Sequence, residues 1–121
     1  MMELCQAVGP ERTGLLLDVF PWDLAGHTLA DFTRIPDVSR VVLAHIMDAP
    51  AGRIPEQQQD AERCLPGETG VLRIADFFEG LKRLGYEGPV QAEPFTPSLV
   101  ELPFEQAAAR VKAAMDSVWP G

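Results

Sequence analysis

The stretch Val41-Val-Leu-Ala-His-Ile-Met-Asp-Ala-Pro50 decides the fold of this chain. It opens with an unbroken apolar run that is rich in β-branched residues, and such a run predicts a strand buried on both faces. His45 and Asp48 follow where this strand should run out, and Pro50 ends it because proline has no N–H to donate. A buried strand that ends in polar side chains predicts a parallel sheet with a site at its carboxyl edge.

Two more units of the same kind flank this stretch. Residues 14–18 form a short apolar run that ends in Asp18, and residues 88–93 form a second one that ends in Glu93. Helical patterns separate the runs, and alternating strands and helices predict right-handed crossovers and a parallel sheet. The sequence therefore predicts an α/β protein with strands near residues 14–18, 40–46 and 89–93.

The helical patterns differ in strength. Residues 1–8 form a short one, with Leu4, Cys5 and Val8 on one face. Thr28 and Asp31 have the spacing of a helix start. The best pattern runs from Ile74 to Leu84 with Gly85 as its C-cap. A final helix should begin at Pro103 and end at Val118, and its expected core face contains Phe104, Ala107, Ala108, Val111, Met115 and Val118.

Length and charge limit the possible functions. The chain has 121 residues and a net charge of −8, so bulk electrostatics disfavour binding to nucleic acid or to an anionic membrane. No apolar run approaches the length of a membrane span, and no signal peptide pattern opens the chain. Cys5 and Cys64 fit no metal or redox motif and are interpreted as reduced thiols, which predicts a cytoplasmic location.

Three residues are candidate metal ligands: Asp18, His45 and Glu93. They occupy equivalent positions after three successive strands, and a mixed set of oxygen and nitrogen ligands suits a divalent ion such as Mn, Mg, Co or Zn. Each residue also has a simpler interpretation. The aspartate would be a turn or cap residue, the histidine a hydrogen-bonded structural residue, and the glutamate a solvated or salt-bridged one.

Two further residues are candidates for binding a substrate. Arg63 lies in a glycine-rich loop, where its guanidinium could hold a carboxylate, a phosphate or a sugar hydroxyl. The alternative is a surface salt bridge with an acid of the same loop. Trp22 could form an apolar wall against a sugar ring, or it could simply pack in the core.

The chain resembles a known family at these residues. The motifs are Gly-Leu-Leu-Leu-Asp-Val-Phe-x-Trp, Val-Leu-Ala-His-Ile-x-Asp-Ala-Pro-Ala-Gly, Arg-Cys-Leu-Pro-Gly-Glu-Thr-Gly and Gly-Tyr-Glu-Gly-Pro-Val-x-x-Glu-Pro-Phe. Together they resemble the sugar phosphate isomerase/epimerase group, the xylose isomerase-like TIM barrels related to inosose dehydratases, 2-keto-myo-inositol isomerases and ketose 3-epimerases. The resemblance runs from about residue 2 to residue 119.

This resemblance implies that residues 1–121 are a C-terminal fragment of an eight-unit barrel, whose full length is about 250 residues. It also implies that Asp18, His45 and Glu93 are three of four metal ligands, that Glu93 is one of two catalytic glutamates, and that Arg63 lies near the substrate. The chain departs from the family pattern at Pro21, where relatives usually have a histidine, and at Met47, where they often have Asn or Asp. Both changes are expected to remove polar groups from the substrate side.

Two functional hypotheses follow. In the first, the chain is part of a divalent-metal-dependent isomerase or epimerase that moves a proton on a ketose or inosose. Such a chain would bind a sugar or sugar phosphate once the rest of the barrel is supplied, for example by a complementing N-terminal fragment. In the second, it is a non-catalytic half-barrel remnant or assembly module that dimerises through its open sheet edges. A nucleic-acid-processing relative is disfavoured by the acidic charge.

Overall fold

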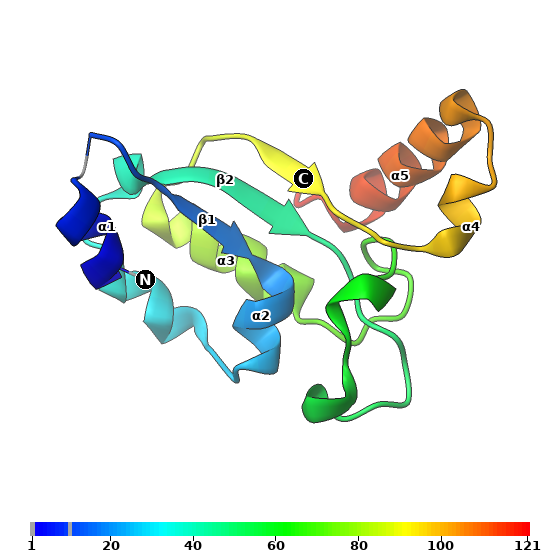
Figure 1. The fold of residues 1–121 in the computed structure, drawn as a ribbon, viewed down its shortest axis with the longest axis horizontal. Coiled ribbons are helices and arrows are strands. Elements are labelled where there is room, and N and C mark those ends of the chain that lie inside the picture. The colour runs from blue at the N-terminus through cyan, green and yellow to red at the C-terminus, as the bar shows by residue number, and fades with distance from the viewer. Residues whose placement is uncertain (1, 10) are drawn as a thin grey trace.

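The computed structural model describes residues 2–9 and 11–121, and a three-stranded parallel sheet organises them. The strands are β1 (Leu15–Asp18), β2 (Val41–Ile46) and β3 (Val90–Ala92). Their order in the sheet is β1-β2-β3, and both neighbouring pairs are parallel (Figure 1). The predicted α/β class and all three predicted strands are confirmed, with bounds that differ by about one residue.

Helices connect and cover the strands. The α-helices are α1 (Met2–Val8), α2 (Val19–Leu24), α3 (Ile74–Leu84), α4 (Pro97–Val100) and α5 (Phe104–Val118). The 3-10 helices are η1 (Leu29–Arg34), η2 (Val38–Arg40), η3 (Pro55–Gln57) and η4 (Asp60–Glu62). Helix α2 was not among the helices that the sequence predicted. Pro21 is the third residue of this helix, where the N–H that proline lacks would have no partner within the helix.

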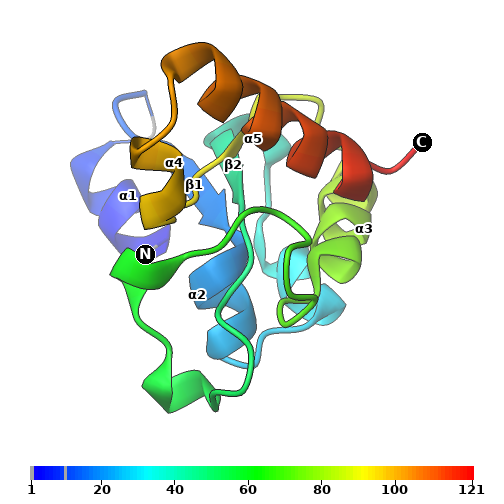
Figure 2. The same ribbon diagram turned by 90° about the vertical axis from the view of Figure 1, so that its right-hand side faces the viewer.

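The core lies between one face of the sheet and the apolar side of α3. Phe77 and Leu81 of α3 pack with Ala44 and Ile46 of β2 in one buried cluster, which also receives Phe32 of η1. The apolar residues of α3 recur at helical spacing, so one side of the helix is buried along its length. The helix ends where predicted, at Gly85, whose φ of +76° suits glycine. Figure 2 shows α2 and α3 on the same side of the strands.

The other face of the sheet remains open in the described residues. Leu16 of β1 is 48% exposed and Val42 of β2 is 56% exposed, although both lie in strands. Only β2 has a partner on each side, so β1 and β3 each leave one edge without a strand neighbour among the described residues. The three units thus form an open sheet, as expected for a segment of a barrel rather than a closed one.

Two predicted helix faces are less buried than expected. In α5, Met115 and Val118 pack against the core, whereas Phe104 at the start of the helix is 85% exposed. Helix α5 follows the edge strand β3, so the described residues offer no further strand for its outer part to cover. In α1, Cys5 is buried, whereas Leu4 and Val8 are 62% and 53% exposed. The described residues include no helix with the length and apolar character needed to cross a membrane.

Candidate metal centre

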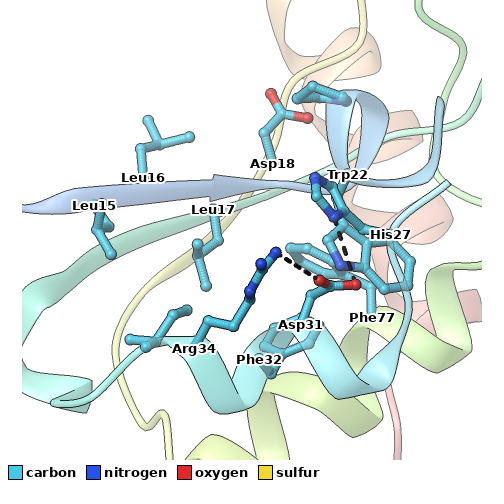
Figure 3. A pocket seen from close by; sticks show the side chains of 12 residues that line it. Leu15, Leu16, Leu17, Asp18, Trp22, His27, Asp31, Phe32, Arg34 and Phe77 are labelled. Atoms are coloured by element: carbon cyan, nitrogen blue, oxygen red, sulfur yellow. Dashed lines mark hydrogen bonds and ion pairs between the residues drawn. The ribbon is translucent and has the colours of Figure 1, made fainter. Parts of the chain in front are cut away.

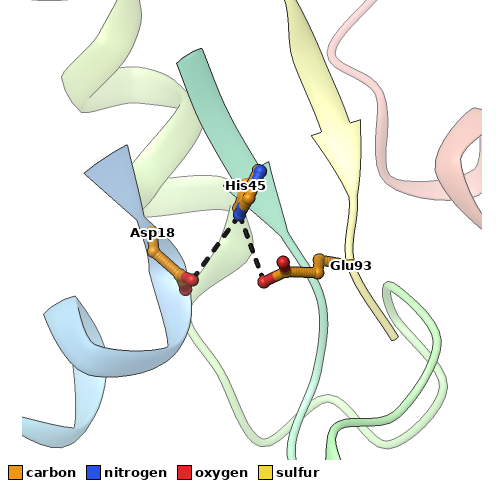
Figure 4. A group of neighbouring side chains, drawn as sticks. All are labelled: Asp18, His45 and Glu93. Atoms are coloured by element: carbon orange, nitrogen blue, oxygen red, sulfur yellow. Dashed lines mark ion pairs between the residues drawn. The ribbon is translucent and has the colours of Figure 1, made fainter. Parts of the chain in front are cut away.

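Strand register brings the three predicted ligands together. Asp18 and His45 are direct partners in the parallel pairing of β1 with β2. His45 pairs with Gln91 of β3, and Glu93 lies two residues further along the chain. Because side chains alternate between the two faces of a strand, Glu93 points to the same face as its register neighbours. Figure 4 shows the two carboxylates pointing toward the imidazole from either side.

The distances define a compact cluster. Nδ1 of His45 lies 3.2 Å from Oε2 of Glu93 and 3.8 Å from Oδ2 of Asp18. One donor atom from each of the three residues lies within 4.8 Å of the others. The His45 and Asp18 side chains are only 8% and 11% exposed, while that of Glu93 is 32% exposed. The cluster is therefore sheltered, with an opening on the glutamate side.

This donor set fits a divalent ion. Oxygen and nitrogen ligands bind such an ion at about 2.0–2.2 Å, which requires donor atoms roughly 3–3.5 Å apart. The observed separations approach this range, and small side-chain movements would complete the fit. Three protein ligands also leave coordination positions for water or substrate, as in catalytic rather than structural sites.

Arg63 joins the cluster from the loop between β2 and α3. Its Nη1 donates to Oδ2 of Asp18 at 2.9 Å and to Oε2 of Glu93 at 2.5 Å. Nε donates to Asp60 at 3.0 Å, and Nη2 also bonds to Asp60. Arg63 therefore lies at the ligand cluster and also forms the expected salt bridge with an acid of its own loop. Its role in holding a substrate stays a prediction.

Asp18 likewise has two roles. Its Oδ1 accepts a hydrogen bond from the N–H of Phe20 at 2.8 Å and caps α2, while Oδ2 accepts from Arg63. Burial raises the pKa of Asp18 above its ordinary value, and the hydrogen bond from Phe20 and the charge of Arg63 oppose this rise. The cap interpretation and the ligand interpretation are thus compatible, since each uses a different oxygen.

The sequence did not indicate what holds Arg63 in place. Its guanidinium carbon lies 5.0 Å from the ring centre of Phe20 and 5.4 Å from that of Phe95, within range of cation–π attraction. Its carbonyl oxygen accepts hydrogen bonds from the N–H of Phe95 at 3.0 Å and from the hydroxyl of Thr96 at 3.2 Å. The loop is therefore fastened to the segment that follows β3 and carries Glu93.

Asp48 is a second residue whose role sequence analysis missed. Its side chain is fully buried, and its carboxylate accepts hydrogen bonds from the main-chain N–H groups of Ala49, Thr69, Gly70, Val71 and Leu72. Its own N–H and carbonyl pair with those of Cys64, the residue after Arg63. Asp48 thus anchors the loop at Cys64, next to Arg63, and again at residues 69–72. The only sequence signal was an acid at a strand end followed by a glycine-rich loop.

Trp22 lies in an aromatic cluster. Its ring centre is 5.8 Å from that of Phe32 and 5.4 Å from that of Phe77, and the guanidinium of Arg73 lies over it at 4.9 Å. These contacts favour the packing interpretation, and a role in substrate binding stays a prediction.

A cavity of about 450 Å³ adjoins Trp22 along β1. Its lining consists mainly of apolar residues, among them Leu15, Leu17, Phe32, Ile35 and Phe77, with His27, Asp31 and Arg34 on the polar side. Figure 3 shows the carboxylate of Asp18 leaving the strand on the side opposite Leu17. Leu16 and Asp18 also line the cavity, so it borders the ligand cluster at the edge of β1.

The expected effect of Met47 on the substrate side needs correction. Met47 is fully buried and packs in the core cluster, so it does not face the substrate side. It is the next residue after Ile46, the last residue of β2, and the chain leaves the strand there toward the core. Pro21, by contrast, is exposed and lines the cavity beside β1.

Comparisons with known proteins identify the family. Residues 1–118 match the family described as xylose isomerase-like TIM barrel, and the chain belongs to that family. An inosose isomerase of Halalkalibacterium halodurans is 31% identical over 118 residues, which are 95% of this chain and 39% of the relative. An inosose isomerase of Bacillus velezensis is 25% identical over 119 residues, 96% of this chain and 40% of the relative. The chain thus spans about two fifths of the length of these relatives.

Solved structures agree with this assignment. A crystal structure of IolI protein with a bound zinc atom superposes with a TM-score of 0.80 at 25% identity, over 96% of this chain and 41% of the other. A xylose isomerase domain protein from Alicyclobacillus acidocaldarius superposes with a TM-score of 0.77 at 29% identity, over 97% and 40%. The three strand–helix units therefore adopt the arrangement of part of a TIM barrel.

Proposed function

We propose that this chain supplies the metal-binding part of a sugar or sugar phosphate isomerase or epimerase active site. The observation that carries the proposal is the cluster of Asp18, His45 and Glu93 at the carboxyl ends of three parallel strands. Family membership and the inosose isomerase relatives support a ketose or inosose as the substrate class. The zinc atom in the IolI structure supports a divalent ion, which could be Zn, Mn, Mg or Co.

In this proposal each residue has a distinct task. Asp18 and His45 hold the ion, which when bound polarises the oxygen atoms of the substrate. Glu93 is more exposed than the other two, so it can both contact the ion and exchange a proton with the carbon next to the substrate carbonyl. Arg63 supplies donors for a substrate oxygen. Moving a proton between adjacent carbons needs a second acid or base, which we assign to another strand of the barrel.

The open sheet supports completion of the barrel by further polypeptide. The apolar residues exposed on its free face, such as Leu16 and Val42, would face the interior of a closed barrel. The apolar cavity beside β1 lies where a preceding strand–helix unit would pack. We propose that residues 1–121 form the C-terminal part of the barrel and that the remaining strands come from the same polypeptide or from a complementing one.

A second candidate function is a non-catalytic assembly module. The exposed edges of β1 and β3 favour it, since a second copy of the chain could pair with them. Pro21 also favours it, because this position lacks the polar side chain common in relatives. The burial of Met47 removes the other argument for this candidate, because a residue in the core says nothing about the substrate side.

The experiment that tests the proposal is a calorimetric titration of Zn²⁺ or Mn²⁺ into the wild-type chain, into His45→Ala and into His27→Ala. The chain has two histidines, and His27 is paired with Asp31 away from the cluster, so His27→Ala controls for adventitious binding by an imidazole. We expect saturable one-site binding by the wild type and by His27→Ala, and loss of that binding in His45→Ala.

Unchanged binding in His45→Ala would overturn the proposed ligand set. A folded wild-type chain that binds no ion would favour the assembly module. Circular dichroism of each variant, compared with the wild type, separates loss of a ligand from loss of the fold.

A further inference from the structure

A guanidinium nitrogen occupies the space between the two carboxylates of the cluster. Nη1 of Arg63 lies 2.9 Å from Oδ2 of Asp18 and 2.5 Å from Oε2 of Glu93. These are the two carboxylate oxygens that also lie nearest to Nδ1 of His45. One positive group thus already bridges the oxygens that the proposed ion would use.

Charge balance explains why a cation sits there. Without Arg63, two carboxylates would face each other in a sheltered place, and ionising both would be unfavourable. The guanidinium side chain is 8% exposed and gives hydrogen bonds to both of them, so it neutralises the pair and fixes its spacing. Arg63 therefore keeps the ligand atoms gathered when no ion is bound.

The same contact must oppose an entering ion. A divalent ion and a guanidinium repel each other, and both bind the same carboxylate oxygens. Arg63 has a second partner that can hold its guanidinium. Nε and Nη2 already bond to Asp60, whose side chain is 73% exposed at the outer end of the loop. Withdrawing Nη1 toward Asp60 would free both oxygens without leaving the guanidinium unpaired.

We propose that Arg63 is a built-in counter-ion of the metal site, which holds Asp18 and Glu93 together in the metal-free chain and is displaced from them when a divalent ion binds. This inference rests on the proposed metal site and adds a mechanism that sets its affinity. It differs from a role in which Arg63 only orients the ligands, because an orienting residue would strengthen metal binding and a competing one weakens it.

The test compares metal affinity in the 121-residue chain by calorimetric titration of Zn²⁺ into the wild type, Arg63→Met, Arg63→Lys and Arg53→Met. Methionine keeps an unbranched apolar stem between Phe20 and Phe95 but has no charge and no donors. Lysine keeps the charge and can still bridge the carboxylates. Arg53 pairs with Glu62 in the same loop, so Arg53→Met controls for the loss of one nearby positive charge.

We expect Arg63→Met to bind Zn²⁺ at least tenfold more tightly than the wild type, or to bind it where the wild type does not. Tenfold corresponds to about 1.4 kcal/mol. Arg63→Lys and Arg53→Met should stay within about threefold of the wild type, a change of about 0.7 kcal/mol. Equal or weaker binding by Arg63→Met would overturn the inference and leave the metal site standing. Binding by none of the variants would overturn both.

A measurement on the wild type covers the case in which Arg63→Met does not fold. The side-chain guanidinium ¹⁵N resonances of arginine can be followed by NMR while Zn²⁺ is added, with Arg63 assigned by its absence in Arg63→Lys. We expect the Arg63 resonances to shift in proportion to bound Zn²⁺ while those of Arg73, which pairs with Asp23, remain fixed. Arg63 resonances that do not change at saturating Zn²⁺ would overturn the inference.

Discussion

Replacing Asp48 by asparagine should remove a large part of the stability of this fold. Each carboxylate oxygen of Asp48 accepts a different set of hydrogen bonds. Oδ1 accepts from the N–H groups of Ala49, Val71 and Leu72, and Oδ2 accepts from those of Thr69 and Gly70. Asparagine has nearly the same shape but only one acceptor oxygen. Whichever way its amide is turned, its NH₂ group faces at least two N–H donors that have lost their acceptor.

The size of the effect follows from these bonds. A hydrogen bond to a charged group is worth about 1.5–3 kcal/mol, so losing two of them should cost about 3–6 kcal/mol. Domains of this size are stable by only about 5–15 kcal/mol, so Asp48→Asn should lose about a fifth or more of the total. The loss should be concentrated in residues 69–72, whose main-chain N–H groups the carboxylate holds.

Urea unfolding followed by circular dichroism, at one protein concentration, measures the change in the free energy of unfolding. Asp76→Asn is the matched control, because Asp76 is an exposed acid in the first turn of α3 and its loss should change stability by no more than about 1 kcal/mol. Hydrogen exchange should show faster exchange of the N–H groups of residues 69–72. A free energy of unfolding for Asp48→Asn within about 1 kcal/mol of the wild type would refute the reasoning.

Two other predictions concern the packing of α3 and the open sheet. Gly80→Ala should lower the melting temperature, because its new Cβ would overlap the ring of Phe32 and overpacking costs about 1–3 kcal/mol, more than the helix gains from alanine. A melting temperature equal to or above that of the wild type would contradict this. The isolated chain should self-associate as its concentration rises, because β1 and β3 each leave one edge unpaired among the described residues and Leu16 and Val42 are exposed. Sedimentation of a concentration-independent monomer that melts cooperatively would count against it.

Local sequence patterns determined the three strands and the main helices of this protein. Apolar runs placed the three strands, and the spacing of Phe77, Phe78 and Leu81 placed α3 up to its cap at Gly85. The candidate site also followed from local rules. Parallel strands bring their carboxyl ends to one edge, and alternation along a strand fixes the face on which Asp18, His45 and Glu93 lie. These features need only neighbouring residues and the period of a strand or helix.

Tertiary structure decided how these elements are used. The two site carboxylates that Arg63 contacts, Asp18 and Glu93, lie 45 and 30 residues away. Four of the five N–H groups that Asp48 holds lie 21 to 24 residues away, so no local pattern could reveal these contacts. The same holds for α5, whose apolar side looked like a core face but lies mostly outside the core because β3 is the last strand of the sheet. Periodicity shows which side of a helix is apolar, but only the packed chain determines whether anything covers that side.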